Sequence, residues 1–271
     1  MNMNRVNNFV HYCARASHTV GIIPTCQWIF GTVQYNLNFS SPRFVRVWPR
    51  FLDHPVKLRA RTSDPFVFRQ IMIENEYAPL GDLKISSILD LGANIGLSSA
   101  WFLNRFPNVR VFAVEADADN YTVCSENLAP YRERAQVVRG AAWSRHATLV
   151  LRWKSCAANI HVHERGTEDV NEVCVEAWDI ANLIRLSGFE RVDLVKIDVE
   201  GVELEIFRSN IDNWLPFVRN LCIELHSQAC RDTFFAALSS YEYQHLKSGE
   251  LDICMNLRPK NDPQGAVHLA N

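Results

Sequence analysis

The most informative stretch of the chain is Ile85-Ser-Ser-Ile-Leu-Asp-Leu-Gly-Ala-Asn-Ile-Gly96. Its first half is a short apolar run, the pattern of a strand buried on both faces of a parallel sheet. Its second half holds Gly92 and Gly96, and a helical pattern follows until Pro107 stops it. Glycine lets a ligand approach the backbone closely, and free amides at a helix start can hold an anion. The stretch therefore predicts a strand, a ligand-binding turn and a helix.

Strand-like and helix-like patterns alternate on both sides of this stretch. The predicted strands cover residues 85–91, 109–115, 135–139, 192–198 and 221–226, and the predicted helices cover 97–106, 119–128 and 202–209. Such alternation indicates βαβ units. Residues 241–246 and 251–257, separated by Lys-Ser-Gly-Glu, predict a terminal hairpin. The predicted fold class is α/β: a doubly wound, mostly parallel sheet with helices on both faces and a C-terminal antiparallel hairpin.

Two further strand-like segments interrupt this alternation. They cover residues 148–153 and 173–177, and a polar insertion at 154–172 lies between them. Both segments are short and largely apolar, as strands are. We therefore expect two edge strands on either side of the insertion.

The composition argues against several classes of protein. The chain has 271 residues, is 48% hydrophobic and 21% charged, and carries a formal net charge of −2. These values are ordinary for a globular protein and give no global attraction to nucleic acid, so none is expected as a partner. The eight cysteines are scattered without a C-x-x-C pair, so neither a zinc site nor a disulfide framework is predicted. This cysteine usage fits a cytoplasmic protein.

No stretch of the sequence is long and apolar enough to predict a transmembrane segment. The nearest candidate, Thr19–Val33, is interrupted by Pro24, Gln27 and two glycines. The N-terminus also lacks the charged start and apolar run of a signal peptide. We expect a plain packed segment at Thr19–Val33, with an interfacial membrane anchor as the alternative.

An acidic residue, Glu115, ends the second predicted strand. A carboxylate in this place can accept hydrogen bonds from both hydroxyls of a ribose. The alternative is an exposed strand-end carboxylate that binds nothing. Because Glu115 follows the glycine turn at the expected distance, we favour a bound nucleoside. The G-x-x-x-G spacing of the turn differs from the G-x-G-x-x-G of dinucleotide sites, which argues against a pyrophosphate ligand.

Several blocks of the chain resemble the FkbM family of methyltransferases in order and spacing. They are Asp90-Leu-Gly-Ala-Asn-Ile-Gly96, Val114-Glu-Ala-Asp117 with Asn120-Tyr121 and Asn127, Gly140-Ala-Ala-Trp143, Lys196-Ile-Asp-Val-Glu-Gly-Val-Glu203, Leu58-Arg-Ala-Arg-Thr-Ser-Asp64 with Val67 and Glu76-Tyr77, and Ile223-Glu-Leu-His226. The block from Lys196 to Glu203 is the most discriminating, because generic methyltransferases rarely carry it. The resemblance implies a Rossmann-like methyltransferase fold.

The resemblance also implies S-adenosylmethionine as the cofactor. It assigns the methionine end to the glycine turn, the ribose to Glu115 and the adenine to the segments around Ala116 and Ala142. Ala116 departs from the family, which usually has proline there, and this departure is expected to loosen the turn. The residues expected to bind the cofactor are Asp90, Gly92, Asn94, Gly96, Glu115, Ala116, Asp117, Ala142 and Asp198.

The resemblance divides the chain into three parts. Residues 56–257 form the expected methyltransferase domain, in which residues 56–84 are an N-terminal lid. Residues 1–55 are an extension of unclear structure, and residues 258–271 are a C-terminal tail. Basic residues gather ahead of the core and predict a solvated basic face, or alternatively a lid that meets an anionic glycan. They are Arg43, Arg46, Arg50, Lys57, Arg59, Arg61 and Arg69.

The chemical step is expected at the carboxyl ends of the fourth and fifth strands, outside which ligands bind in such sheets. Lys196 and Asp198 share one face of the fourth strand, while Glu224 and His226 share one face of the fifth. We expect Lys196 to pair with Glu224 inside the sheet, because a buried charge needs a partner. Asp198 and His226 then lie at the rim as the predicted catalytic residues. A divalent metal held by such a cluster ranks second, since nothing in the spacing requires one.

The resemblance implies transfer of a methyl group to a hydroxyl of a carbohydrate, a glycan or a similar small molecule. A hydroxyl acceptor must lose its proton, which suits a base such as His226. Asp198-Val-Glu-Gly201 stands where methyltransferases acting on exocyclic amines are expected to show an Asn/Asp-Pro-Pro-aromatic element, so DNA amines are not expected acceptors. Two alternatives remain: a nicotinamide-dependent oxidoreductase on a related sheet, and a non-catalytic protein that binds S-adenosylmethionine.

Overall fold

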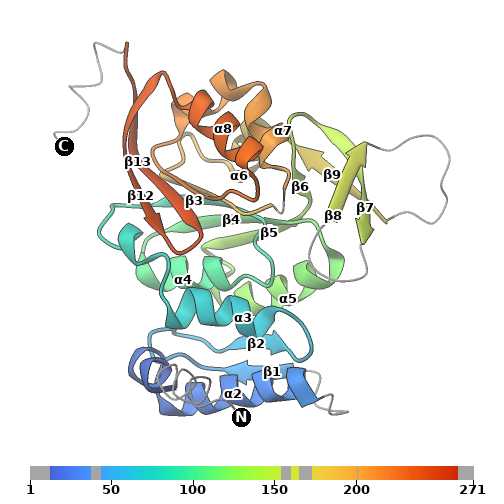
Figure 1. Cartoon of the computed structure of the whole chain (residues 1–271), viewed down its shortest axis with the longest axis vertical. Helices are drawn as coiled ribbons and strands as arrows, with labels where there is room; N and C mark the ends of the chain where they lie inside the picture. The colour runs from blue at the N-terminus through green and yellow to red at the C-terminus, as the bar shows by residue number, and fades with distance from the viewer. Residues whose placement is uncertain (1–12, 38–43, 154–159, 165–172, 200, 262–271) are drawn as a thin grey trace.

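A seven-stranded sheet runs through the centre of the molecule (Figure 1). The computed structural model describes residues 13–37, 44–153, 160–164, 173–199 and 201–261. The strand order is β12-β13-β11-β10-β3-β4-β5, in which the five strands from β11 to β5 are parallel and β13 runs antiparallel to β11. The bounds are β3 Ser87–Leu91, β4 Arg110–Glu115, β5 Ala135–Arg139, β10 Leu194–Ile197, β11 Leu221–Glu224, β12 Tyr241–Ser248 and β13 Leu251–Pro259. The predicted fold class, including the terminal hairpin, is confirmed.

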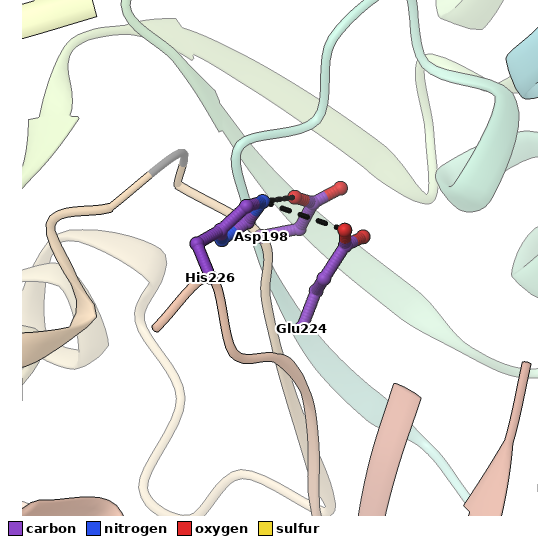
Figure 2. Close-up of side chains that lie close together, drawn as sticks. All are labelled: Asp198, Glu224 and His226. Carbon is purple, nitrogen blue, oxygen red and sulfur yellow. Dashed lines mark ion pairs between the residues drawn. The ribbon is translucent and has the colours of Figure 1, made fainter. Parts of the chain in front are cut away.

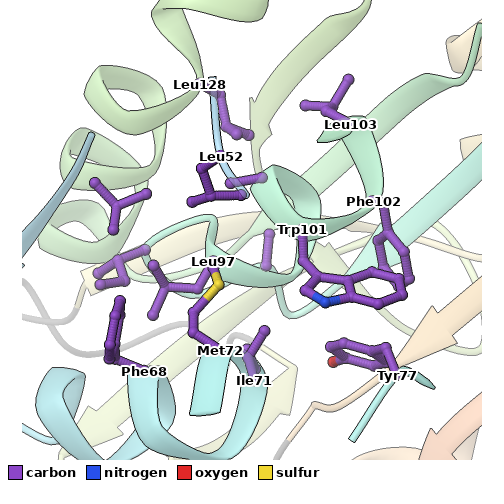
Figure 3. Packing of buried hydrophobic residues seen from close by; sticks show 14 of the residues in the cluster. Leu52, Phe68, Ile71, Met72, Tyr77, Leu97, Trp101, Phe102, Leu103 and Leu128 are labelled. Carbon is purple, nitrogen blue, oxygen red and sulfur yellow. The ribbon is translucent and has the colours of Figure 1, made fainter. Parts of the chain in front are cut away.

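Helices cover both faces of this sheet because successive strand residues point to opposite sides. Ile88, Val111 and Leu194 pack with α4 (Leu97–Arg105) and α5 (Ala118–Leu128) in one core cluster, part of which Figure 3 shows. Their strand neighbours form a second cluster with three other helices on the opposite face. Those helices are α6 Ile180–Ser187, α7 Glu203–Arg208 and α8 Gln228–Ala237. The described residues also contain a π-helix, η1 Arg69–Ile73, and short 3-10 helices, which are η2 Ala78–Leu80, η3 Ala129–Tyr131, η4 Ile211–Asn213 and η5 Leu215–Phe217.

A second, smaller sheet follows β5. It has the order β6-β9-β7-β8, with β6 Ala141–Ala142, β7 Ala147–Trp153, β8 Ile160–Glu164 and β9 Val173–Trp178. The segments expected as edge strands are therefore strands of a separate sheet, and the polar insertion contributes β8 to it. Residues 154–159 and 165–172 of the insertion lie outside the described residues. Leu149, Leu151 and Val175 bury one another in a cluster of their own, which explains why these strands pair together.

The N-terminal extension packs onto the α4–α5 face. It contains a helical segment at residues 13–19, then α2 (Ile22–Leu37) and β1 (Phe44–Val47), and it leads into β2 (Val56–Arg59) and α3 (Asp64–Phe68). β1 and β2 form an antiparallel pair that lies beside α2 in Figure 1. Trp28 and Val47 belong to the same core cluster as α4 and α5. Within the described ranges, no helix combines the length and apolar character that a membrane crossing needs.

The hairpin strand β12 forms one edge of the large sheet. Its register against β13 shifts between Glu242 and Gln244, which marks a β-bulge. Glu242 and Lys247 are exposed on this strand. The edge is therefore charged and irregular.

Candidate active site

The glycine turn, Asp90–Gly96, connects three neighbouring strands at the carboxyl edge of the sheet. The backbone amides of Gly92 and Ala93 both donate to the carbonyl of Val114 in β4, each at 3.0 Å. Gly92 has φ of +75°, and a Cβ added there would overlap the backbone carbonyl of Asp198, just after β10. Gly92 is therefore required by the close approach of two protein segments.

Asp90 is fully buried beneath this turn. The hydroxyls of Ser98 and Ser99, in the first turn of α4, donate to its Oδ2, each at 2.6 Å. Lys196 Nζ lies 3.2 Å from Asp90 Oδ1 and donates to the carbonyl of Gly92 at 2.7 Å. The side chain of Asp90 thus ties the strand, the helix start and the next strand together.

Lys196 pairs with Asp90 and not with Glu224, so the predicted Lys196–Glu224 pair is wrong. The reason is the register: Lys196 stands opposite Asp90 of β3 on one side and Cys222 of β11 on the other. Its Nζ also lies 3.6 Å from Asp198 Oδ2. Burial opposes the charge of Lys196, but the carboxylates of Asp90 and Asp198 outweigh burial and hold its pKa above the ordinary value.

Glu115 ends β4 and is only 6% exposed. Its Oε2 accepts from the amide of Asn94 at 2.8 Å, while its Oε1 accepts from the amide of Asp117 at 2.9 Å and from Asn120 Nδ2 at 3.4 Å. Burial raises the pKa of Glu115 above its ordinary value, although these hydrogen bonds act in the opposite direction. The carboxylate is therefore held in one orientation against the glycine turn.

Arg59 of β2, in the segment 56–84 that was expected from the sequence to form a lid, contacts this side of the site. Its guanidinium donates to both carboxylate oxygens of Asp64, at 3.0 and 2.9 Å, and to Asn120 Oδ1 at 2.7 Å. The backbone amide of Asn120 in turn donates to Oδ1 of Asp117, the N-cap of α5, at 2.7 Å. Arg59 therefore braces the loop after β4. Of the other two residues expected near the adenine, Ala142 is buried and Ala116 is half-buried.

A second group of polar side chains, the rim cluster, consists of Asp198, Glu224 and His226. Figure 2 shows the three side chains pointing toward one another from the ends of β10 and β11. His226 Nε2 lies 4.0 Å from Asp198 Oδ1 and 3.4 Å from Glu224 Oε1. Their side chains are between 24 and 33% exposed. The two predicted catalytic residues thus lie together, and Glu224, which was expected inside the sheet, joins them.

Glu203 holds the other nitrogen of the His226 ring. Its Oε1 lies 2.7 Å from His226 Nδ1, and its side chain is fully buried in the first turn of α7. It also accepts from the amide of Gly201 at 3.2 Å and so braces the start of α7. Burial opposes the ionisation of Glu203, but the hydrogen bond with His226 and those from the backbone outweigh it and lower its pKa.

Sequence reasoning missed the contact between Glu203 and His226. The only signal was the Asp-x-Glu-x-x-Glu spacing, which places an acidic residue at a helix start soon after the strand end. Glu200, in the same segment, lies outside the described residues.

The geometry of the rim cluster supports two kinds of chemistry. With Nδ1 directed at Glu203, His226 presents Nε2 to the space between two carboxylates, where it can accept or hold a proton. The three residues also offer one ligand atom each within 4.8 Å of one another, and carboxylate oxygens with an imidazole nitrogen suit a divalent cation.

Comparison with known proteins gives consistent matches. Residues 90–247, more than half of the chain, match the model of the methyltransferase FkbM domain. The chain is 28% identical over 190 residues to methyltransferase sdnD of Sordaria araneosa, covering 59% of this chain and 73% of that protein. It is 23% identical over 189 residues to methyltransferase 1 of Beauveria bassiana, covering 61% and 75% respectively.

Solved structures are also similar. The crystal structure of methyltransferase FkbM from Methylobacillus flagellatus KT aligns with a TM-score of 0.46 and 19% identity. The alignment covers 68% of this chain and 47% of that chain, so the present chain spans about half of its length.

Proposed function

The chain belongs to the FkbM methyltransferase family, and we propose that it transfers a methyl group from S-adenosylmethionine to a hydroxyl of a carbohydrate or similar small molecule. Family membership decides against the nicotinamide-dependent oxidoreductase. The observation that carries the hydroxyl acceptor is the His226 ring, held by Glu203 at Nδ1 with Nε2 directed toward Asp198. A hydroxyl needs a base, and this ring is oriented as one.

The residues around Glu115 fit the proposed cofactor. An ionised carboxylate has about four lone-pair positions, and three donors, two of them backbone amides, use some of those of Glu115. Capacity therefore remains for the two hydroxyls of a ribose. The turn around Gly92 would lie along the methionine end, with Asp117 and Ala142 near the adenine. S-adenosylmethionine, when bound, supplies a methyl group on a sulfonium that leaves as a neutral thioether.

Proton removal falls to His226 in this proposal. Its Nε2 takes the hydroxyl proton, and the oxygen is then the nucleophile toward the methyl carbon. The ring becomes positively charged at that moment, and the buried carboxylate of Glu203 stabilises that charge. Asp198 and Glu224, on either side of Nε2, accept hydrogen bonds from the acceptor and orient it.

The test measures methyl transfer to a panel of glycans and small hydroxyl compounds by mass spectrometry. His226→Gln should lower kcat by about 10²–10⁴-fold, the usual contribution of a general base, and leave S-adenosylmethionine affinity unchanged. The matched control is His245→Gln, because His245 also faces a carboxylate, Asp252 at 2.8 Å, but lies on β12 outside the site. Equal activity of His226→Gln and the wild type would show that His226 is not the general base. Cofactor binding without any methylated product would favour the non-catalytic alternative.

A divalent cation at the rim cluster is the second candidate, and the convergence of three ligand atoms within 4.8 Å favours it. In that case the cation polarises the hydroxyl, and His226 is a ligand. The two mechanisms differ in their response to a chelator. Full activity in chelator together with an inactive His226→Gln supports the base, whereas activity that chelator abolishes and magnesium or manganese restores supports the cation.

A further inference from the structure

Helix α2 exposes an apolar stripe. None of its 16 residues carries a charge, and Ile22 and Ile23 are each 72% exposed, while Phe30 is 51% exposed. Ile22, Cys26, Phe30 and Val33 are all exposed, and their spacing of four, four and three residues puts them on one side of the helix. An uncharged helix with one apolar side exposed to water is a candidate surface for binding a partner.

The opposite side of α2 is firmly attached to the protein. Trp28 is buried, and its indole Nε1 donates to the carbonyl of Pro65 at 2.8 Å. Thr25 is also buried. The exposed stripe is therefore presented outward by a helix whose orientation is fixed, at the end of the molecule drawn lowest in Figure 1.

Two aromatic side chains extend the apolar surface. Trp48 is 56% exposed, and its backbone amide donates to Gln27 Oε1 on α2 at 3.3 Å. Phe51 is exposed in the turn that follows, and Arg50 ties this turn to the start of α2 by donating from its backbone amide to the carbonyl of Val20 at 2.9 Å. These hydrogen bonds hold the turn after β1 against α2, and both segments expose large apolar side chains.

Charge is distributed unevenly in this part of the chain. Residues 1–52 contain five arginines and no lysine, aspartate or glutamate, so they carry +5 in a chain whose net charge is −2. Three of these arginines, Arg15, Arg46 and Arg50, lie within the described residues and are exposed. Within residues 1–52 the formal charge is therefore entirely positive, and the first acidic residue of the chain is Asp53.

We propose that α2 and the Trp48–Phe51 turn bind the surface of an anionic bilayer, with the helix lying in the plane of the interface. An uncharged helix side that inserts apolar residues, aromatic side chains at headgroup depth and neighbouring arginines is the combination that such binding requires. A nucleic acid would need the cations at the centre of the contact, but the centre here is apolar. A second copy would bring two sets of the exposed Arg15, Arg46 and Arg50 together, which opposes pairing.

The test uses the full chain with vesicles of phosphatidylcholine alone and of phosphatidylcholine with about one third phosphatidylserine. We expect sedimentation with the anionic vesicles only, weakened by salt. The double variant Ile22→Gln/Phe30→Gln should lower the affinity by about tenfold or more, because two apolar side chains no longer insert. Arg46→Gln should lower it about fivefold on anionic vesicles, as expected for one basic residue.

The matched control is Leu186→Gln, which removes a 52% exposed leucine from α6, far along the chain from α2. It should bind vesicles as the wild type does, and circular dichroism melts should show that every variant is folded. The proposal would be overturned if the protein bound both kinds of vesicle equally and if the α2 substitutions left that binding unchanged. A dimer that forms without lipid and is lost in Ile22→Gln/Phe30→Gln would also overturn it, since a second copy would then cover the stripe.

Discussion

The glycine turn and the rim cluster lie at the same edge of the sheet, but their carboxylates differ in burial and in hydrogen-bond partners. Asp90 and Glu115 are almost completely buried, and each receives hydrogen bonds from hydroxyls or amides of the protein. Asp198 and Glu224 are about one quarter to one third exposed and face the titratable His226. The first arrangement is rigid before any ligand binds, and the second remains open to an acceptor and its proton. The comparison separates a buried layer, to which we assign cofactor positioning in the proposed function, from an open layer, to which we assign proton transfer.

The largest expected effect comes from Lys196, which contacts both regions. Lys196→Met leaves Asp90 buried without its cation, and breaking a buried pair costs roughly 3–5 kcal/mol. Urea unfolding should show a loss of that order. Lys247→Met is the control, because Lys247 is 55% exposed and lies 3.5 Å from Asp252, so it should lose about 1 kcal/mol or less. Equal losses of unfolding free energy in the two variants would contradict the distinction between buried and solvent-exposed ion pairs.

Gly92 tests the rigidity of the turn itself. Gly92→Ala should cost about 3 kcal/mol, because its Cβ would overlap the Asp198 carbonyl and its φ is positive. Gly188→Ala shares the positive φ, +69°, but its Cβ meets nothing within 4 Å, so about 1 kcal/mol is expected. Thermal unfolding of the two variants separates steric overlap from backbone strain. If Gly92→Ala were as stable as Gly188→Ala, the backbone of the turn would be able to shift and accommodate the added Cβ.

Glu115 tests whether the buried layer binds the cofactor. Glu115→Ala should weaken S-adenosylmethionine binding about tenfold or more in calorimetry, since a hydrogen bond to a charged group is worth roughly 1.5–3 kcal/mol. Acceptor KM should change little. Asp119→Ala removes an exposed carboxylate from the first turn of α5 and should bind the cofactor as the wild type does. Unchanged affinity in Glu115→Ala would exclude this carboxylate from the site.

The smallest expected effect concerns pH and Glu76, whose side chain approaches Gly249 in the β12–β13 turn. Burial, with the charges of Glu74 and Glu250, raises the pKa of Glu76 to about 7, and Asp198 adds to this. Because the folded pKa lies above the ordinary 4.5, the stabilisation from the neutral carboxyl is complete at acid pH and is lost as pH rises through about 7. Glu76→Gln should therefore gain about 1 kcal/mol relative to the wild type between pH 5 and 8, after allowance for solvent screening. The measurement is the free energy of unfolding of both proteins as a function of pH. A difference between them that stays constant from pH 5 to 8 would contradict the raised pKa of Glu76.

The local sequence pattern was sufficient to predict the glycine turn and the strands and helices around it. Period-two alternation also put Asp198 and His226 on the faces from which they meet. The partner of Lys196 could not be obtained in this way, because β10 has a neighbour on each side and only the register shows that Asp90 stands opposite. The Glu203–His226 contact joins a helix start to the end of another strand, so it depends on packing that no local pattern encodes. The small sheet was missed for a similar reason, since its strands pair across an insertion.

The bulge in β12 has a consequence for the behaviour of the protein at high concentration. An edge strand offers unpaired backbone groups to any other strand, and long flat edges promote fibre-like polymerisation. Here the ladder is interrupted between Glu242 and Gln244, and charged side chains at Glu242 and Lys247 would be desolvated by an added strand. The irregular hairpin that completes the sheet thus also keeps its open edge from templating amyloid-like growth.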